Sequence, residues 1–205
     1  VIIGGGPAAT NAVETIRQYS SEDKITLISS EPAHSRMALP YWVAGQIPRE
    51  QSYTGDADSF SKLQVDAKIG STVSQLDAAN KSLTLEDGSQ VNFDELLIAT
   101  GSRPLDLPIP GADGPGVHHL WTLAQTEAVL EDTKQLTQPR VVMIGAGFIG
   151  LIVLNAMYKR GWKLSVVEQQ SQVLPRMLNS DAANIAKNWL QGRGVDVHTG
   201  VSVKA

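Results

Sequence analysis

The chain has no cysteine among its 205 residues, and it has neither a long apolar run nor a basic cluster. Without cysteine, no disulfide, thiol–disulfide relay or cysteine-ligated iron–sulfur cluster forms within these residues. No apolar run approaches the roughly 18 residues that suggest a membrane span, and nothing resembles a signal peptide. The net charge of −4 makes nucleic acid an unexpected partner. We therefore expect a cytoplasmic protein without a membrane span.

Two glycine-rich motifs dominate what is present. Residues 1–9 are VIIGGGPAA and residues 141–150 are VVMIGAGFIG. Each motif places an apolar run, typical of a buried parallel strand, before a glycine-rich turn that opens a helix. Each is followed by a second apolar strand and an acid, Glu31 or Glu168. Two complete dinucleotide-binding fingerprints predict two bound dinucleotides and electron transfer from one to the other.

The small residues of each motif have separate tasks. The first glycine allows a tight turn, the second lets the backbone approach a pyrophosphate at the helix N-terminus, and the last small residue lets the helix pack on its strand. In this order they are Gly4, Gly6 and Ala9 in the first motif, and Gly145, Gly147 and Gly150 in the second.

The acids at the strand ends, Glu31 and Glu168, can each accept hydrogen bonds from a ribose diol. A carboxylate at Glu168 also repels a 2′-phosphate, which favours NAD over NADP. The alternative is that either acid is a solvated residue at a strand end. The repetition of the same arrangement favours the binding interpretation.

The remaining pattern predicts an α/β fold with two Rossmann-like, doubly wound parallel-sheet domains. From Val65 to Leu97 short alternating strands form a β-meander around an Asp87-Gly88 hairpin turn, and residues 96–99 return to a buried strand. Residues 31–45 are predicted to be irregular. A proline- and glycine-rich linker over residues 104–116 separates a domain of residues 1–108 from one of residues 109–205.

Two helices of the second domain have clear signals. Thr122 and Gln125 form a capping box, and a helix after Ser180 is predicted to bury Ile185, Ala186, Trp189 and Leu190. The sequence begins inside a predicted strand and ends before the second domain closes. We therefore expect it to be a fragment of a longer chain.

Essentially the whole chain resembles the pyridine nucleotide–disulfide oxidoreductase superfamily. Besides the two fingerprints, the resemblance rests on Leu97-Ile98-Ala99-Thr100-Gly101 after the meander, on Ile109-Pro110-Gly111 in the linker, and on Leu174-Pro175-Arg176. It implies a first domain that binds FAD and carries the meander, and a second domain that binds NAD, with NADH preferred over NADPH. It also implies a homodimer in the full-length form.

The resemblance implies a set of cofactor-binding residues. For FAD these are Gly4, Gly6, Pro7, Ala8, Glu31, Arg36, Val73, Ala99, Thr100 and Gly101, and for NADH they are Gly145, Gly147, Phe148, Ile149, Gly150 and Glu168. Arg103 is a further candidate for a cofactor phosphate, with a place at the domain junction as the alternative. Arg36 has the alternative of a surface arginine, and His34 could reach the cofactor or stabilise a turn.

The chain also departs from the family pattern. Met37 stands where coenzyme A–disulfide reductases and NADH oxidases carry a redox cysteine, and a thioether is no nucleophilic thiolate. The segment from His34 to Gly45 is more similar to rubredoxin or ferredoxin reductases and to the flavin part of NADH-dependent nitrite reductases. Ile152 replaces a glutamate that relatives commonly carry near nicotinamide and flavin, and Trp121 stands where many carry an arginine.

These observations predict an FAD-dependent oxidoreductase that passes electrons from NADH through FAD to an external acceptor, without a redox-active disulfide. The acceptor is rubredoxin, ferredoxin, a nitrite-reducing metal centre, oxygen or a quinone. Hydride transfer needs no acid–base residue, so no catalytic side chain is assigned, and the adjacent His118 and His119 lack further ligands for a metal. One alternative is a redox-sluggish flavin-binding module with a structural or regulatory role. Another is that these 205 residues alone bind neither cofactor well.

Overall fold

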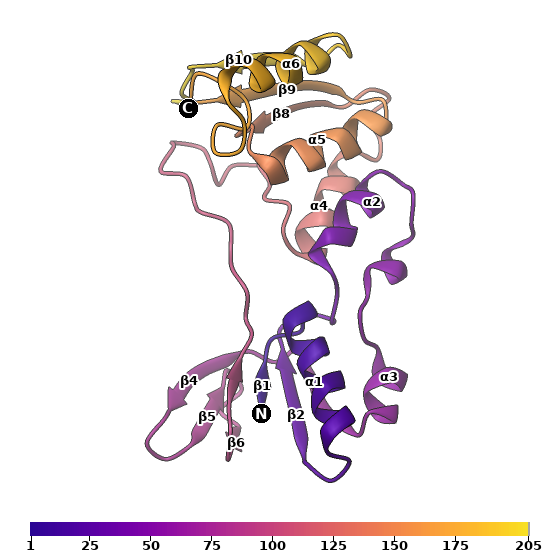
Figure 1. The fold of residues 1–205 in the computed structure, drawn as a ribbon, viewed down its shortest axis with the longest axis vertical. Helices are drawn as coiled ribbons and strands as arrows, with labels where there is room; N and C mark the ends of the chain where they lie inside the picture. Colours follow the sequence, from indigo (N-terminus) through magenta and orange to yellow (C-terminus); the bar gives the residue numbers. More distant parts are fainter. Residues whose placement is uncertain (205) are drawn as a thin grey trace. The chain divides into compact units, whose positions relative to one another are not determined.

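The computed structural model describes residues 1–204, which form two compact units (Figure 1). The first unit contains residues 1–38 and 49–103. The second contains residues 39–48 and the chain from Pro104 onward. The chain thus passes finally from the first unit to the second between Arg103 and Pro104, at the start of the predicted linker and a few residues before the predicted domain boundary after residue 108. The excursion of residues 39–48 into the second unit has no counterpart in the sequence prediction.

A four-stranded parallel sheet is the centre of the first unit, with strand order β3-β2-β1-β7. The strands are β1 (Ile2–Ile3), β2 (Ile25–Ser29), β3 (Val65–Ile69) and β7 (Leu97–Ile98). Ile2 lies opposite Leu27 on one side and Leu97 on the other. The meander was predicted to begin near Val65, but β3 pairs in parallel with β2. It therefore extends the main sheet.

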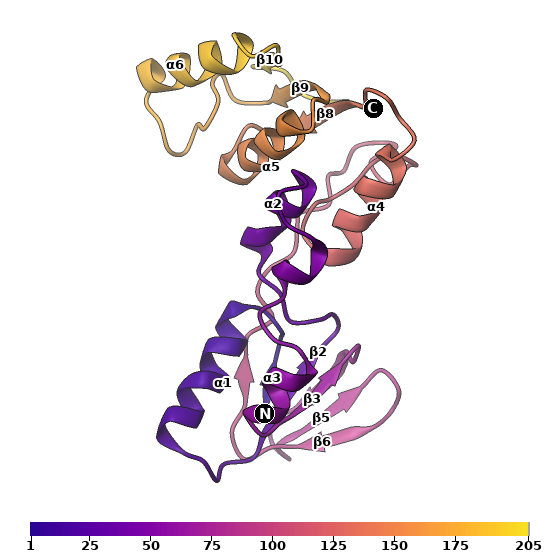
Figure 2. The same cartoon turned by 90° about the vertical axis from the view of Figure 1, so that its right-hand side faces the viewer.

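Different layers cover the two faces of this sheet (Figure 1, Figure 2). Successive side chains of a strand point to opposite faces. Ile25 and Leu27 pack with α1 (Pro7–Tyr19) and with Phe60 of α3 (Ala57–Lys62). Ile28 packs instead with Leu83 and Leu85 of the meander.

The meander is an antiparallel sheet of three strands in the order β4-β5-β6. The strands are β4 (Val73–Asp77), β5 (Ser82–Leu85) and β6 (Gln90–Asn92). Gly88, in the turn between β5 and β6, has φ +84°, which suits a glycine in a tight hairpin. The predicted meander and its Asp87-Gly88 turn are confirmed.

The prediction of a buried strand after the meander is wrong. Leu97 and Ile98 of β7 are 41% and 59% exposed. The physical reason lies in the strand order: β7 is at the edge of the sheet, and among the described residues no strand pairs with its outer side. An apolar run indicates a strand but does not say whether a neighbour covers it.

Residues 31–45 are also more regular than predicted. They include a 3₁₀ helix, η1 (Arg36–Ala38), and a short helix, α2 (Leu39–Val43); a second 3₁₀ helix, η2 (Arg49–Ser52), follows. Pro40 is tolerated because it lies in the first turn of α2, where its missing N–H is not needed. Within the second unit α2 packs against α4 (Leu123–Thr133) and α5 (Phe148–Lys159), and the Arg160 Nε–H donates to the Val43 carbonyl oxygen.

The second unit is built on a parallel sheet of order β10-β9-β8. The strands are β8 (Arg140–Ile144), β9 (Lys163–Glu168) and β10 (Asp196–Thr199), and the helices besides α2 are α4 (Leu123–Thr133), α5 (Phe148–Lys159) and α6 (Ser180–Gln191). The predicted capping box is confirmed: the Gln125 N–H donates to Thr122 Oγ1 at 3.1 Å, and Gln125 Oε1 accepts from the Thr122 N–H at 3.2 Å.

The predicted buried face of α6 is only partly right. Leu190 is 6% exposed and Ala183 1%, but Ile185 is 72% exposed and Trp189 49%. Residues 183 and 190 lie seven apart, and therefore on the stripe that faces the core. Residues 185 and 189 lie four apart on the other side of the helix, which the described residues leave open. Arg193 covers part of it, with its guanidinium carbon 3.6 Å from the centroid of the Trp189 ring.

Candidate dinucleotide-binding sites

The loop that joins β1 to α1 is held tightly at its start and open at its end. Gly4 has φ +124°, and a Cβ built there would lie 2.2 Å from the Ala99 carbonyl oxygen. The Gly4 N–H donates to the Ile28 carbonyl oxygen at 2.8 Å. Gly6, the N-cap of α1, has no side-chain cap, and its Cβ would meet nothing within 4 Å. Such an open helix N-terminus suits an anion.

A groove of about 310 Å³ lies beside this loop in the first unit. Among the residues predicted for FAD, those that line it are Gly4, Gly6, Glu31, Arg36, Val73, Ala99 and Thr100. The structure therefore brings together residues from four separate stretches of the sequence. Ser71 and Thr72 also line the groove. Sequence reasoning missed them; the only signal was their place between two strand signals.

The other predicted residues of this site lie outside the groove lining. Pro7 and Ala8 are exposed in the first turn of α1, and Arg103 is exposed after β7. Gly101 has φ +71°, and a Cβ there would lie 3.2 Å from Arg36 Nη1. The missing side chain of Gly101 thus leaves room for the Arg36 guanidinium.

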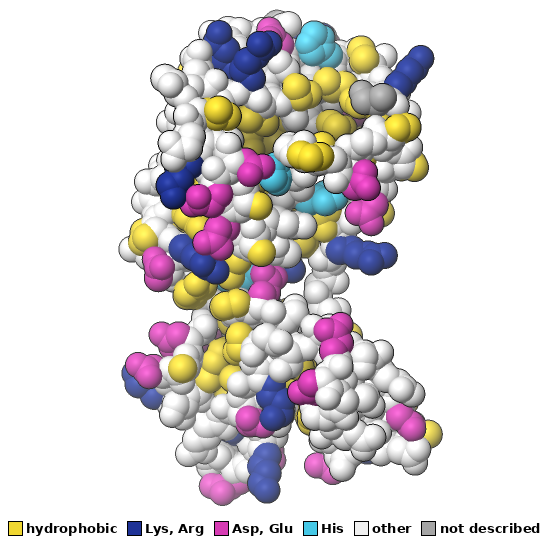
Figure 3. Space-filling view, turned by 180° about the vertical axis from the view of Figure 1, so that it is seen from behind, with side chains coloured by type: hydrophobic (Ala, Val, Ile, Leu, Met, Phe, Trp, Pro, Cys, Tyr) yellow, Lys and Arg dark blue, Asp and Glu magenta, His cyan; other side chains and the backbone are white. Residues whose placement is uncertain are grey.

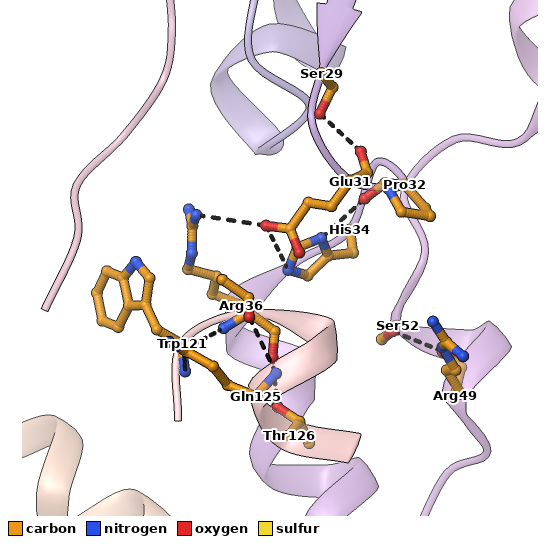
Figure 4. Close-up of polar contacts among 11 residues, drawn as sticks. Ser29, Glu31, Pro32, His34, Arg36, Arg49, Ser52, Trp121, Gln125 and Thr126 are labelled. Atoms are coloured by element: carbon orange, nitrogen blue, oxygen red, sulfur yellow. Dashed lines mark hydrogen bonds and ion pairs between the residues drawn. The ribbon is translucent and has the colours of Figure 1, made fainter. Parts of the chain in front are cut away.

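Glu31 stands between two basic side chains (Figure 4). Its Oε1 lies 3.9 Å from Arg36 Nη2 and 4.0 Å from His34 Nε2. Both distances are longer than a hydrogen bond, and the contact with His34 is an ion pair only if the imidazole is protonated. The Ser29 hydroxyl donates to the Glu31 carbonyl oxygen at 2.7 Å and holds the backbone at the strand end. The Glu31 side chain is 24% exposed, so it can still meet a ligand.

One ring nitrogen of His34 stabilises a turn, which was one of the two roles considered for this residue. Its Nδ1 lies 2.9 Å from the Pro32 carbonyl oxygen, within the turn that follows β2. A carbonyl only accepts, so Nδ1 is the donor. The backbone of His34 also bridges to Tyr53.

The second loop, between β8 and α5, repeats the geometry of the first. Gly145 has φ +98°, and its N–H donates to the Val167 carbonyl oxygen at 2.7 Å. A Cβ at Gly147, the N-cap of α5, would meet nothing within 4 Å. At Gly150 a Cβ would lie 2.5 Å from the Gly145 carbonyl oxygen. The last glycine of this motif therefore gives the helix the close approach predicted for it.

Glu168 contacts the backbone of this loop. Its Oε2 accepts from the Ala146 N–H at 2.9 Å, and its Oε1 accepts from the Gln170 N–H at 2.8 Å. Each oxygen keeps a further lone pair for a ribose hydroxyl. The Leu174 N–H donates to the Ala146 carbonyl oxygen at 2.9 Å, a contact that the sequence did not indicate.

The first turn of α5 carries the remaining predicted residues. Phe148 and Ile149 are 54% and 53% exposed. Ile152, where the family resemblance led us to expect a glutamate, is half-buried one turn further on. No charged side chain of this helix turn is therefore available to a ligand at the loop.

Residues 1–205 match the sequence profile of the family described as pyridine nucleotide-disulphide oxidoreductase. The chain belongs to this family. The match covers both glycine-rich loops, and with it the predicted family and α/β class are confirmed. The family points to binding of FAD and NAD(H), the two dinucleotides for which the loops were proposed.

Relatives extend beyond the residues of this chain. An NADH oxidase of Methanocaldococcus jannaschii is 33% identical over 205 residues, which cover 96% of this chain and 46% of that protein. Rhodocoxin reductase of Rhodococcus erythropolis is 31% identical, with 100% of this chain and 48% of that protein covered. The chain spans about half the length of the curated relatives it matches.

Solved structures of the family share the fold. An NAD-dependent persulfide reductase from A. fulgidus matches with a TM-score of 0.91 and 30% identity, over 99% of this chain and 40% of that one. A putidaredoxin reductase, solved in a covalent complex with putidaredoxin, matches with a TM-score of 0.90 and 25% identity, over 98% of this chain and 49% of that one.

Three further observations concern membrane spans, metal ligands and surface charge. Over residues 1–204, no helix has both the length and the apolar character to cross a membrane. No group of three or more histidine or acidic side chains in that range is arranged to hold a metal ion. On the face drawn in Figure 3, basic and acidic side chains are interspersed, and the described residues of that face form no continuous basic surface.

Proposed function

We propose that this chain is the cofactor-binding part of an oxidoreductase that passes electrons from NADH through FAD to an external acceptor. The observation that carries the proposal is the paired geometry of the two loops. Each opens a helix N-terminus at a glycine, Gly6 or Gly147, around which a Cβ would meet nothing within 4 Å. Each has a carboxylate at the end of the neighbouring strand. Two dinucleotide sites in one chain suit transfer of electrons between two cofactors.

The residues of the first unit fit FAD. Arg36 supplies a positive charge for a diphosphate, and Glu31 supplies acceptors for a ribose diol. Both line the groove beside the open N-terminus of α1. FAD, when bound, supplies a ring that takes up a hydride and gives electrons onward. The task of the chain is to hold it, with Val73, Ala99 and Thr100 as the proposed remaining contacts.

The residues of the second unit fit NADH. Gly147 leaves the first turn of α5 open to a pyrophosphate, and Glu168 lies at the end of β9 beside the loop. A carboxylate at that place repels the 2′-phosphate of NADPH, which supports the preference for NADH. The proposed FAD domain is thus the first unit and the proposed NAD domain the second.

Met37 supports an electron path without a disulfide. It is 68% exposed and no cysteine stands in the chain, so thiol exchange within these residues is excluded. Electrons then leave for an external acceptor, and the names of two matched proteins, rhodocoxin reductase and putidaredoxin reductase, support a small redox protein. Homodimer formation stays a prediction.

Ile152 favours a second candidate, a redox-sluggish flavin-binding module with a structural or regulatory role. An apolar residue stands on α5 where relatives commonly carry a glutamate, and it offers no charge to a nicotinamide at the loop. The two candidates differ in the rate at which NADH reduces the bound flavin.

The deciding experiment is the visible spectrum of the purified protein before and after anaerobic addition of NADH. A flavin spectrum that bleaches within seconds supports the oxidoreductase, and one that persists supports the sluggish module. A colourless protein would support the third alternative, that these 205 residues alone do not hold the cofactor. The Glu168→Arg variant should retain FAD but lose NADH binding and flavin reduction; unchanged NADH affinity would refute the second site.

A further inference from the structure

His34 is buried, and only one of its two ring nitrogens forms a hydrogen bond among the described residues. Its side chain is 4% exposed, and Nδ1 donates to the Pro32 carbonyl oxygen. In the neutral ring Nε2 is then an acceptor. This nitrogen is buried, and among the described residues it has no hydrogen-bond partner. A buried polar atom in this state is costly, and such atoms ordinarily have a partner in the functional form of a protein.

The group that faces Nε2 is the Glu31 carboxylate, with Oε1 at 4.0 Å (Figure 4). A neutral Nε2 and a carboxylate oxygen are both acceptors, so the pair forms no hydrogen bond. A proton on Nε2 converts the same pair into a charge-assisted hydrogen bond once the two atoms approach by about 1 Å. The geometry therefore offers a place for a proton between His34 and Glu31.

Arg36 lies on the other side of the same carboxylate oxygen, at 3.9 Å, and it lines the groove. A phosphate that enters the groove competes with Glu31 for this guanidinium, because arginine pairs strongly with phosphate oxygens. When Arg36 turns to a phosphate, Glu31 loses a positive neighbour. His34 is then the nearest group in the cluster that can replace it.

We propose that His34 is a positioning residue for Glu31: protonated on Nε2, it holds the carboxylate in the groove while Arg36 engages the phosphate of a bound dinucleotide. The inference rests on the proposed FAD site. Glu31, Arg36 and a neutral His34 together carry no net charge, whereas the protonated cluster carries one positive charge and attracts a diphosphate. Binding of FAD therefore takes up a proton at His34.

The other charged groups near His34 do not offer this exchange. η2 contributes Arg49 and Glu50; Glu50 is exposed, and Figure 4 shows Arg49 beside Ser52, apart from the imidazole. Tyr53 bridges to His34 through the backbone, and a tyrosine carries no charge at neutral pH. Glu31, with Arg36 beside it, is therefore the charged group that acts on the imidazole.

The test is calorimetric titration of the FAD-free protein with FAD, in buffers of different ionisation enthalpy, at about pH 6 and about pH 8, the range in which a histidine titrates. The wild type should take up close to one proton per FAD between these limits. Its Kd for FAD should be lower at about pH 6 than at about pH 8, by up to about tenfold per pH unit, because one proton binds with each FAD. This contribution is present at low pH and is lost as the pH rises.

Two variants separate positioning from mere packing. In His34→Gln the amide donates permanently, so FAD should bind with little dependence on pH and without proton uptake. His198→Gln, on the exposed side of β10, is the matched control and should keep the wild-type pH profile. Proton uptake that persists in His34→Gln, or a wild type without pH dependence, overturns the inference.

A second measurement, on the wild type alone, tests the inference even if the His34→Gln variant does not fold. The ring nitrogens of His34 in the wild type, followed by NMR, should change protonation state at neutral pH when FAD is added, and an unchanged signal overturns the inference. If the wild type binds no FAD at any pH, the proposed first site fails and the inference fails with it. If it binds FAD but without a proton, the site stands and only the inference falls.

Discussion

Glu168 holds the second glycine-rich loop at Ala146: its Oε2 accepts a hydrogen bond from the Ala146 N–H at 2.9 Å. The carbonyl oxygen of the same residue accepts from the Leu174 N–H, also at 2.9 Å. Ala146 is completely buried. A side chain from the end of β9 and a backbone group beyond it thus fix the loop on both sides. Glu168 therefore has a structural task besides the ligand contact proposed for it.

Replacing Glu168 by alanine should destabilise the second unit. The change leaves the buried Ala146 N–H without its charged acceptor, and we expect the free energy of unfolding to fall by about 1.5–3 kcal/mol. Glu168→Gln keeps one acceptor oxygen and should lose roughly half of that. Denaturant unfolding of the three proteins measures the difference.

A matched control for this series is Glu14→Ala, because Glu14 is an exposed acid on α1. Its free energy of unfolding should stay within about 0.5 kcal/mol of the wild type. Equal stability of Glu168→Ala and Glu14→Ala would show that the bond to Ala146 contributes nothing to the loop.

The sequence assigned the same task to Glu31 and Glu168, and the structure gives them different surroundings. The spacing of strand, glycine turn, helix and acid is local along the chain, so both positions could be predicted. The partners are not local: Glu168 contacts Ala146, 22 residues away, whereas Glu31 faces two side chains of its own segment. Which contact forms depends on tertiary packing that no spacing rule contains.

The segment of residues 39–48 illustrates the same limit at the level of the fold. Its five-residue helix is too short to show an apolar period, and Pro40 argues against a helix when the position within the turn is unknown. What decides its place is a set of contacts with α4 and α5, including the bond from Arg160 to Val43. The strands β8 and β9 and the capping box at Thr122, by contrast, are specified by neighbouring residues and were predicted at the right places. The predicted burial of the strand before the second glycine motif is wrong, because Val142 and Ile144 of β8 are 61% and 47% exposed.

Asp56 makes the free energy of unfolding of the first unit depend on pH in the acidic range. It caps α3, and hydrogen bonds from the Ser59 hydroxyl and then the Ser59 N–H lower the pKa of its carboxyl below the ordinary value of 3.8. The stabilisation is therefore present above the unfolded-state pKa and lost as the pH falls through the lower folded-state pKa. Asparagine caps a helix about as well without titrating. Asp56→Asn should consequently lose less stability than the wild type below about pH 4.

Urea unfolding at a series of pH values measures this difference. The free energies of wild type and Asp56→Asn should approach or cross each other as the pH falls from about 5 to about 2. Curves that stay parallel throughout would mean that the cap does not depend on the charge of Asp56.

The two sides of α6 should respond differently to truncation. Leu190 is 6% exposed and belongs to the core of the second unit, so Leu190→Ala should cost about 2–4 kcal/mol. Ile185 is 72% exposed, and Ile185→Ala should cost less than about 0.5 kcal/mol. Thermal or denaturant unfolding of both variants checks the contrast. A large loss in Ile185→Ala would mean that the side carrying Ile185 is covered in solution.

Gly4 and Gly6 lie two residues apart in one loop, but an added methyl group meets different surroundings at each. At Gly4 φ is +124° and a Cβ would lie 2.2 Å from the Ala99 carbonyl oxygen, so Gly4→Ala should cost about 2–4 kcal/mol of stability. At Gly6 φ is −80° and the space is open. No clash arises, so Gly6→Ala should cost no more than about 1 kcal/mol, because alanine is a poorer N-cap residue than glycine.

The same methyl group at Gly6 should weaken FAD binding, because it enters the space through which a phosphate approaches the N-terminus of α1. Denaturant unfolding and FAD titration, done on the same preparations, separate the two effects. Gly6→Ala should combine a small loss of stability with a Kd for FAD raised by at least about tenfold, a loss of about 1.4 kcal/mol of binding energy. Full FAD affinity in a stable Gly6→Ala variant would contradict a phosphate at this loop. The loop would then serve only to join β1 to α1.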